Sequence, residues 1–141
     1  MYDILILSHG HLAEGFYRTM EMIFGEEPKI RWASLMEGES PEEFGKKLEE
    51  RVDWESTCGL LVLCDLFGGS PCMGAVSRLM DCGKKWRMVA GINLPMIMEA
   101  YSRRGEDLDI SADALLREGC SNIVDVNARL AQGNYDVDED E

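Results

Sequence analysis

The sequence has 141 residues, of which 45% are hydrophobic and 29% are charged, a composition typical of one globular domain. A chain of this length buries about two-thirds of its unfolded surface, so it needs neither a disulfide nor a metal ion to be stable. Its 27 acidic and 14 basic residues give a net charge of −13, which argues against direct binding to nucleic acid.

The first half of the chain alternates between strand and helix patterns. The apolar run Ile4–Leu7 predicts a strand, and apolar residues at helical spacing over 12–23 predict a helix that ends at Gly25. Residues 30–35 alternate in character and include a charge, which indicates a half-exposed edge strand. Ser40 then begins a helix, because a proline follows it directly and a glutamate stands three positions later, as in a capping box.

The second half continues the alternation. Gly59–Cys64 is the most apolar run, which is typical of a strand buried on both faces in a parallel sheet. A glycine-rich turn leads to a helix for which we expect Ser70 as the N-cap and Pro71 at the first position. A fourth strand is predicted over 88–92, and Asn93 opens the helix that follows it.

The C-terminal part is less regular. Ser111 is the expected cap of a fifth helix, which ends near Glu118, and Asn122–Val126 has the composition of a short last strand. A weak helix is expected after it. We expect one domain over residues 1–133, followed by an acidic and disordered tail over 134–141 that is dispensable for folding.

Repeated strand–helix units predict an α/β fold with an open, doubly wound parallel sheet. The first and third strands are apolar throughout and the second is not, which favours the strand order 2-1-3-4. In such sheets a ligand lies beyond the carboxyl ends of the strands where the order reverses. The predicted site therefore lies between the ends of the first and third strands.

His9 and Asp65 follow these two strands directly, and neighbouring strands lie about 4.8 Å apart. A hydrogen bond from the His9 ring to Asp65 would fix the tautomer and leave Nε2 as a free nucleophile. Gly10, Gly68 and Gly69 lie in the two loops, where helix N-termini and close backbone approach favour a phosphoryl group. The hydroxyl of Ser70 is a further candidate contact for that group.

Other interpretations of these residues stay open. Asp65 at a strand end also suits a turn cap, the Gly-Gly-Ser-Pro segment suits a plain helix start, and His9 suits a structural role. His11 is expected to lie exposed at a helix start. A metal site on the two histidines matches no usual zinc spacing, so we expect no metal, and Cys64 and Cys72 are expected to be small buried residues.

The five cysteines form an odd number without a Cys-x-x-Cys pair, unlike the disulfide framework of a secreted protein. The first apolar run is too short for a signal peptide, and no stretch approaches the roughly 20 apolar residues of a membrane span. We therefore expect a soluble protein of the cytoplasm.

Three segments resemble one known family, the EIIA component of mannose-class sugar phosphotransferase systems. They read ILILSHGHLAEG from Ile4, DLFGGSP from Asp65 and GINLPM from Gly91, and the resemblance covers about residues 2–130. It implies a 2-1-3-4 sheet with a fifth, antiparallel strand exchanged across a homodimer, and that strand would be Asn122–Val126. The family often has Asn where Met73 stands, and Thr or another residue where Cys64 stands.

The resemblance also implies the function. His9 would receive a phosphoryl group from the phosphocarrier protein HPr and pass it to the EIIB component, while the sugar is selected by EIIB and the EIIC/EIID membrane permease. Asp65 would orient His9, Ser70 would contact the phosphoryl group, and no cofactor is implied. Two alternatives remain: a regulatory subunit that senses phosphorylation without transport, and a metal-dependent hydrolase that uses His9 and His11.

Overall fold

The computed structural model describes residues 1–26 and 29–133, and the acidic tail predicted over 134–141 lies outside the described residues. Four parallel strands form one sheet, β1 (Asp3–His9), β2 (Ile30–Leu35), β3 (Leu60–Cys64) and β4 (Trp86–Ala90). Their order is β2-β1-β3-β4, which confirms the order predicted from the sequence. The two central strands, β1 and β3, are the most apolar, because both of their faces are covered.

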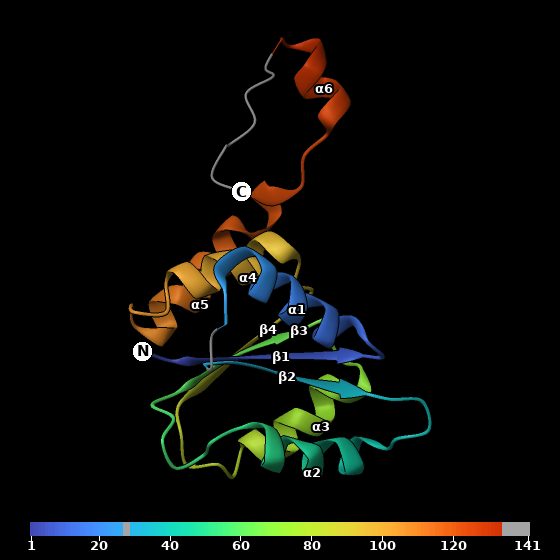
Figure 1. Ribbon diagram of the computed structural model, residues 1–141, viewed down its shortest axis with the longest axis vertical. Coiled ribbons are helices and arrows are strands. Elements are labelled where there is room, and N and C mark those ends of the chain that lie inside the picture. Colours follow the sequence, from blue (N-terminus) through green and yellow to red (C-terminus); the bar gives the residue numbers. More distant parts are fainter. Residues whose placement is uncertain (27–28, 134–141) are drawn as a thin grey trace.

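Helices cover the two faces of the sheet (Figure 1). One face carries α1 (Leu12–Phe24), α4 (Leu94–Ser102) and α5 (Leu108–Glu118), and the other carries α2 (Pro41–Arg51) and α3 (Ser70–Leu79). Alternate residues of β1 serve the two cores: Ile4 and Ile6 pack under α1 and α4, and Leu5 and Leu7 pack against α2 and α3. Among the described residues, none of the helices has the length and apolar character required to cross a bilayer.

The predicted start of α2 is confirmed. Ser40 is the N-cap and its hydroxyl accepts from the amide of Glu43 at 3.1 Å, with Pro41 in the first turn. Asn93 likewise caps α4, because its side chain accepts from the amide of Met96 at 3.0 Å. Both helices therefore begin where their sequences predict.

Two other predicted caps were wrong. The N-cap of α3 is Gly69, whose carbonyl accepts from Met73, so Ser70 is the first helical residue and does not cap the helix. The N-cap of α5 is Asp107, whose carboxylate accepts from two amides of the first turn. Ser111 is buried inside α5 and donates to the carbonyl of Arg103 at 3.2 Å. The first amides of α5 are thus met by Asp107, whereas no side chain caps α3.

Strand β4 begins two residues earlier than predicted and ends at Ala90 instead of Ile92. Its register against β3 runs from Leu60 opposite Trp86 to Cys64 opposite Ala90. Gly91 follows with a φ of +79°, a backbone conformation that ends the strand. The apolar character of Ile92 reflects its packing against the core on the α1 and α4 side, not membership of the strand.

The strand predicted over Asn122–Val126 is absent from the described residues. A 3-10 turn, η1 (Gly119–Asn122), leads through a short extended link to α6 (Val126–Ala131), whose N-cap is Asp125. The Asp125 carboxylate accepts from the amide of Ala128 at 3.1 Å, so a helix forms where a strand was expected. Residues 119–133, here called the arm, begin with η1 against α4 and α5, and the part beyond η1 projects away from the sheet and its helices (Figure 1).

Candidate active site

Two strands deliver the predicted site residues to one edge of the sheet. His9 is the last residue of β1, and Asp65 directly follows β3. The amide of Asp65 donates to the carbonyl of Leu7 at 3.1 Å, so the ladder between β1 and β3 extends to this residue. The two side chains therefore leave adjacent strand ends at the point where the strand order reverses.

The Asp65 carboxylate holds His9 at two points. Oδ2 lies 3.0 Å from the ring nitrogen Nδ1 and also accepts from the backbone amide of His9 at 3.0 Å. The Asp65 side chain is 13% exposed, whereas the His9 side chain is 44% exposed. With Nδ1 directed at a carboxylate, Nε2 is the ring nitrogen left free to react. The predicted contact between the two residues is therefore present.

Gly69 lies directly against the edge of the His9 ring formed by Cε1 and Nε2. A Cβ atom at this position would meet His9 Cε1 at 2.6 Å and Nε2 at 3.1 Å, so the close approach requires a glycine. Since Gly69 caps α3, the free amides at the start of that helix lie on the Nε2 side of the imidazole. The start of α3 thus supplies partial positive charge next to the His9 ring.

Gly10 and Gly68 shape the two loops. Their φ angles are +56° and +78°, which residues other than glycine rarely adopt. The Gly10 amide donates to the carbonyl of Leu35 at 2.8 Å and so ties the first loop to β2. Ser70, the remaining predicted contact, is the first residue of α3, and its hydroxyl has no hydrogen-bond partner within the described part of the chain.

Sequence reasoning missed the role of Ser8. This buried residue precedes His9, and its hydroxyl accepts from the amide of Ala13 at 2.6 Å. His11 occupies the N-cap position of α1 but makes no side-chain cap bond. Ser8 therefore replaces the missing cap and ties the loop that carries His9 to the first turn of α1. The signal in the sequence was a helix start without a good N-cap residue.

An exposed apolar rim, formed by the loop after Asp65 and the first turn of α3, adjoins the site and was also missed. Phe67 is 84% exposed, and Leu66 and Met73 are each more than half exposed. The Leu66 side chain reaches the Gly69 backbone beside His9. A turn of the chain seldom presents large apolar side chains to water, so this rim is suited to contact with another protein.

The other candidates lie as the sequence suggested. His11 is exposed at the start of α1, and Cys64 and Cys72 are buried. Burial raises the pKa of the Cys64 thiol to about 12, which leaves it protonated and inert. No group of three His, Cys, Asp or Glu side chains placed to hold a metal ion occurs in residues 1–26 and 29–133.

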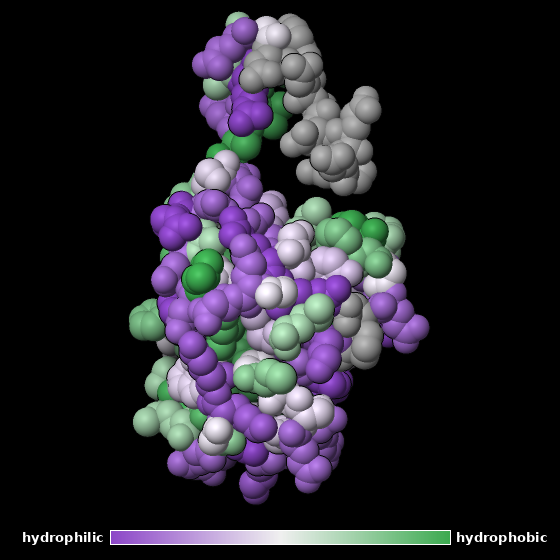
Figure 2. Space-filling model, turned by 90° about the vertical axis from the view of Figure 1, so that its left-hand side faces the viewer, coloured by the Kyte–Doolittle hydropathy of each residue, from purple (hydrophilic) through white to green (hydrophobic). Residues whose placement is uncertain are grey.

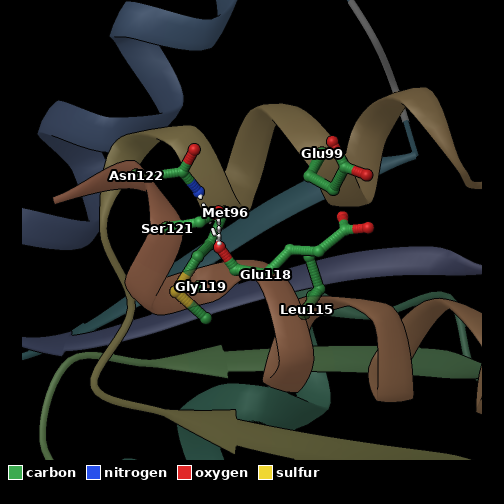
Figure 3. A pocket seen from close by; sticks show the side chains of 7 residues that line it. All are labelled: Met96, Glu99, Leu115, Glu118, Gly119, Ser121 and Asn122. Atoms are coloured by element: carbon green, nitrogen blue, oxygen red, sulfur yellow. Dashed lines mark hydrogen bonds between the residues drawn. The ribbon is translucent and has the colours of Figure 1, made fainter. Parts of the chain in front are cut away.

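A cavity of about 270 Å³ lies elsewhere, between α4, α5 and η1 (Figure 3). Its wall contains Met96 and Gly119, which are in close contact: a Cβ at Gly119 would lie 3.1 Å from the Met96 sulfur. Ser121 and Asn122 both donate to the carbonyl of Glu118, which fixes the base of the arm. The wall shares no residue with the His9 site, so this cavity is a separate feature at the attachment of the arm.

The sequence matches the profile of a known family over residues 3–116. The family is EIIA-man, described as "PTS system fructose IIA component", where PTS denotes the phosphotransferase system. The chain belongs to the EIIA-man family. This agrees with the resemblance seen in the sequence, and both histidine and aspartate of the site lie inside the matched region.

Individual EIIA relatives support the assignment. The mannose-specific EIIAB component of Escherichia coli K12 is 34% identical over 105 residues, which are 74% of this chain and 32% of that protein. The chain thus spans about a third of the length of these curated EIIAB relatives. The fructose-specific EIIA component of Bacillus subtilis is 27% identical over 146 residues, with 100% of this chain and 99% of that protein covered.

A solved structure of an EIIA protein has the same fold. The phosphotransferase system component EIIA from Streptococcus agalactiae superimposes with a TM-score of 0.79 at 28% identity. The match covers 91% of this chain and 99% of that chain. The 2-1-3-4 sheet of this chain is therefore the architecture of EIIA proteins.

Proposed function

We propose that His9 is a phosphocarrier residue, which accepts a phosphoryl group from HPr and passes it to EIIB during sugar uptake. The observation that carries this proposal is the 3.0 Å contact between His9 Nδ1 and Asp65 Oδ2 at the strand ends. It leaves Nε2 free beside the start of α3. Membership of the EIIA-man family supports the same assignment.

In the proposed reaction the lone pair of His9 Nε2 attacks the phosphorus atom of phosphorylated HPr in line. A new N–P bond forms as the bond from phosphorus to the HPr nitrogen breaks, and the bonding electrons return to HPr. His9 keeps its Nδ1 proton and becomes positively charged, and the Asp65 carboxylate stabilises that charge. Transfer to EIIB repeats the step with His9 as the leaving group.

The transferred group carries negative charge, which the start of α3 is placed to stabilise. Backbone amides after Gly69 and the Ser70 hydroxyl are the proposed donors to its oxygens. Gly68 and Gly69 allow the backbone to approach closely. Phosphoryl transfer depends mainly on positioning and charge stabilisation, so we expect this site to work without a metal ion or organic cofactor.

The exposed apolar rim is the proposed docking surface for both HPr and EIIB. Phe67 and Leu66 project from the loop that follows Asp65, and Met73 projects from the first turn of α3. Each partner must bring its own nucleophile to His9, so a shared apolar contact around this side chain serves both transfers. The charge of −13 adds attraction for a basic carrier at long range.

We further propose that the protein is a homodimer that uses the arm. Every residue from Ser121 to Gly133 is exposed, including Ile123, Val126 and Leu130. Figure 2 shows apolar groups where the arm leaves the rest of the molecule. Exposed apolar side chains are stabilised when a second surface buries them. A second copy of the chain can do so in an isologous interface, in which both subunits use the same surface.

The central proposal is tested by incubation with phosphoenolpyruvate, Enzyme I and HPr, followed by intact-mass measurement. We expect one acid-labile, alkali-stable phosphoryl group per chain. His9→Ala abolishes it, whereas the matched control His11→Ala retains it, because His11 is exposed at the helix start and has no carboxylate partner within the described residues. A phosphoryl group that persists in His9→Ala would overturn the assignment.

A further inference from the structure

A second concave feature opens at the free edge of β2. The cavity has a volume of about 160 Å³, and its wall comes from α1, β2 and α2. In Figure 1, β2 is the outer strand, with α1 on one face of the sheet and α2 on the other. The wall includes His11, two residues beyond His9, but neither His9 nor Asp65.

Two side chains of the wall present unused hydrogen-bond donors. Ser34 is 5% exposed, and its buried Oγ has no hydrogen-bond partner among the described residues. A buried polar atom of this kind is uncommon in a native structure. The Arg51 guanidinium stacks on Trp32, 4.4 Å from the ring centroid, and has no carboxylate partner in residues 1–26 and 29–133. Its N–H groups are therefore available to a ligand.

Lys47 adds a held positive charge. Its ammonium donates to the Ser34 carbonyl at 2.8 Å and to Glu39 Oε1 at 2.7 Å. An ammonium has three N–H donors, so one of them remains for a ligand. The carboxylate of the wall, Glu14, accepts from Arg18 at 3.3 Å, which offsets its charge.

We propose that this cavity binds the phosphate group of a small phosphate monoester, held by Ser34, Lys47 and Arg51. A guanidinium can give two parallel hydrogen bonds to phosphate oxygens, while an ammonium acts as a point charge and a hydroxyl reaches a third oxygen. The volume is well below the roughly 300 Å³ at which drug-sized sites begin, so the organic part has only a few carbon atoms.

This site is separate from the proposed phosphoryl acceptor His9, so an experiment can refute one proposal without refuting the other. The proposed event is reversible binding of a phosphate monoester, in which no covalent bond forms or breaks and no phosphoryl group is transferred to His9. Its oxygens would lie beside the loop formed by His9, Gly10 and His11, because His11 belongs to both the loop and the cavity wall. A ligand bound in this cavity would therefore be close enough to influence the conformation of that loop.

Isothermal titration calorimetry of the whole chain with glycerol 3-phosphate tests the proposal, with glycerol as the uncharged control. We expect saturable one-to-one binding of the phosphate ester and no binding of glycerol. Arg51→Gln and Ser34→Ala each weaken binding about tenfold or more, because each removes a hydrogen bond to a charged group. Arg117→Gln, which removes the same charge from an exposed position on α5, leaves the affinity unchanged.

Amide and indole shifts in nitrogen-15 NMR spectra locate the ligand. We expect shifts at the Trp32 indole and at Ser34, with circular dichroism showing that the variants stay folded. Absence of saturable binding would overturn the proposal, as would equal weakening by Arg117→Gln. Shifts confined to Ser70 and Cys72 would also overturn it, because they would place the phosphate at the start of α3 beside His9.

Discussion

In the proposed mechanism, the reactivity of His9 depends on one carboxylate and one glycine. Asp65 approaches the ring on the Nδ1 side and Gly69 on the Nε2 side, so the imidazole is held between two strand-end loops. Asp65 also binds the backbone amide of His9, which fixes the base of the side chain as well as its ring. Each of these contacts has a separate consequence that a single substitution can measure.

Asp65→Asn should leave the fold intact and slow phosphorylation of His9 by about 100-fold or more. The amide has nearly the shape of the carboxylate but lacks the charge that stabilises the positive ring. Rapid-quench measurement of transfer from phosphorylated HPr checks this, with Asp81→Asn, an exposed position at the end of α3, as the charge-matched control. An unchanged rate would show that Asp65 only caps a turn.

Gly69→Ala should impair phosphorylation although it adds only a methyl group. The new Cβ would lie 2.6 Å from His9 Cε1, so the ring must turn away from the start of α3. Gly15→Ala is the matched control, because a Cβ there meets nothing within 4 Å and an alanine stabilises a helix interior by about 0.5–1 kcal/mol. Equal rates for the two variants would contradict the close approach at Gly69.

At the scale of elements, α1 is positioned by a residue outside it. The hydroxyl of Ser8, still in β1, accepts from the Ala13 amide in the first turn, whereas the N-cap residue His11 contributes no side-chain bond. Strand, loop and helix are thereby joined on both sides of His9. The stability of α1 and the position of the nucleophile should consequently change together.

Ser8→Ala should lower the free energy of unfolding by about 1 kcal/mol, as loss of a helix cap does. It should also slow phosphorylation of His9, because the loop loses its tie to α1. Urea denaturation and the transfer assay measure the two effects. Ser77→Ala, an exposed serine in α3, is the control and should change neither. Loss of stability at full transfer rate would separate the cap from the positioning of His9.

At the scale of the whole molecule, the arm is the feature whose apolar side chains a single chain leaves exposed. Its base is fixed by hydrogen bonds to the Glu118 carbonyl and by the contact between Gly119 and Met96 (Figure 3). Beyond that base the arm has exposed apolar residues and no buried ones within the described chain. An arm that is fixed at its base and exposes apolar side chains beyond it is suited to bind the surface of a partner.

Light scattering at micromolar concentration should therefore give about twice the monomer mass of 15.9 kDa. Ile123→Asp places a charge on an apolar arm residue that is 76% exposed in one chain, and it should shift the population towards monomer. Asn127→Asp, which adds the same charge at a polar position of α6, should leave the dimer intact. A wild-type mass near the monomer value would rule the dimer out.

The sequence alone determined the strand order of the sheet and the proximity of His9 to Asp65. Apolar runs identify β1 and β3 as central strands, and with the edge character of β2 they predict the order 2-1-3-4, because strands that are covered on both faces are mainly apolar. That order brings His9 next to Asp65. The apolar run of a strand and the residues at its end are both local features, so each can be recognised from a few consecutive residues.

Only the tertiary structure decided which groups complete these local patterns. Ser8 reaches Ala13, Gly69 meets the His9 ring, and Asp107 takes the cap that Ser111 was expected to supply. Each contact depends on how a loop or a helix end is placed in the fold, which a few neighbouring residues do not specify. The arm shows the same limit: residues 122–126 have strand composition, but in the described part of the chain they join neither edge of the sheet and form a turn, an extended link and the start of a helix.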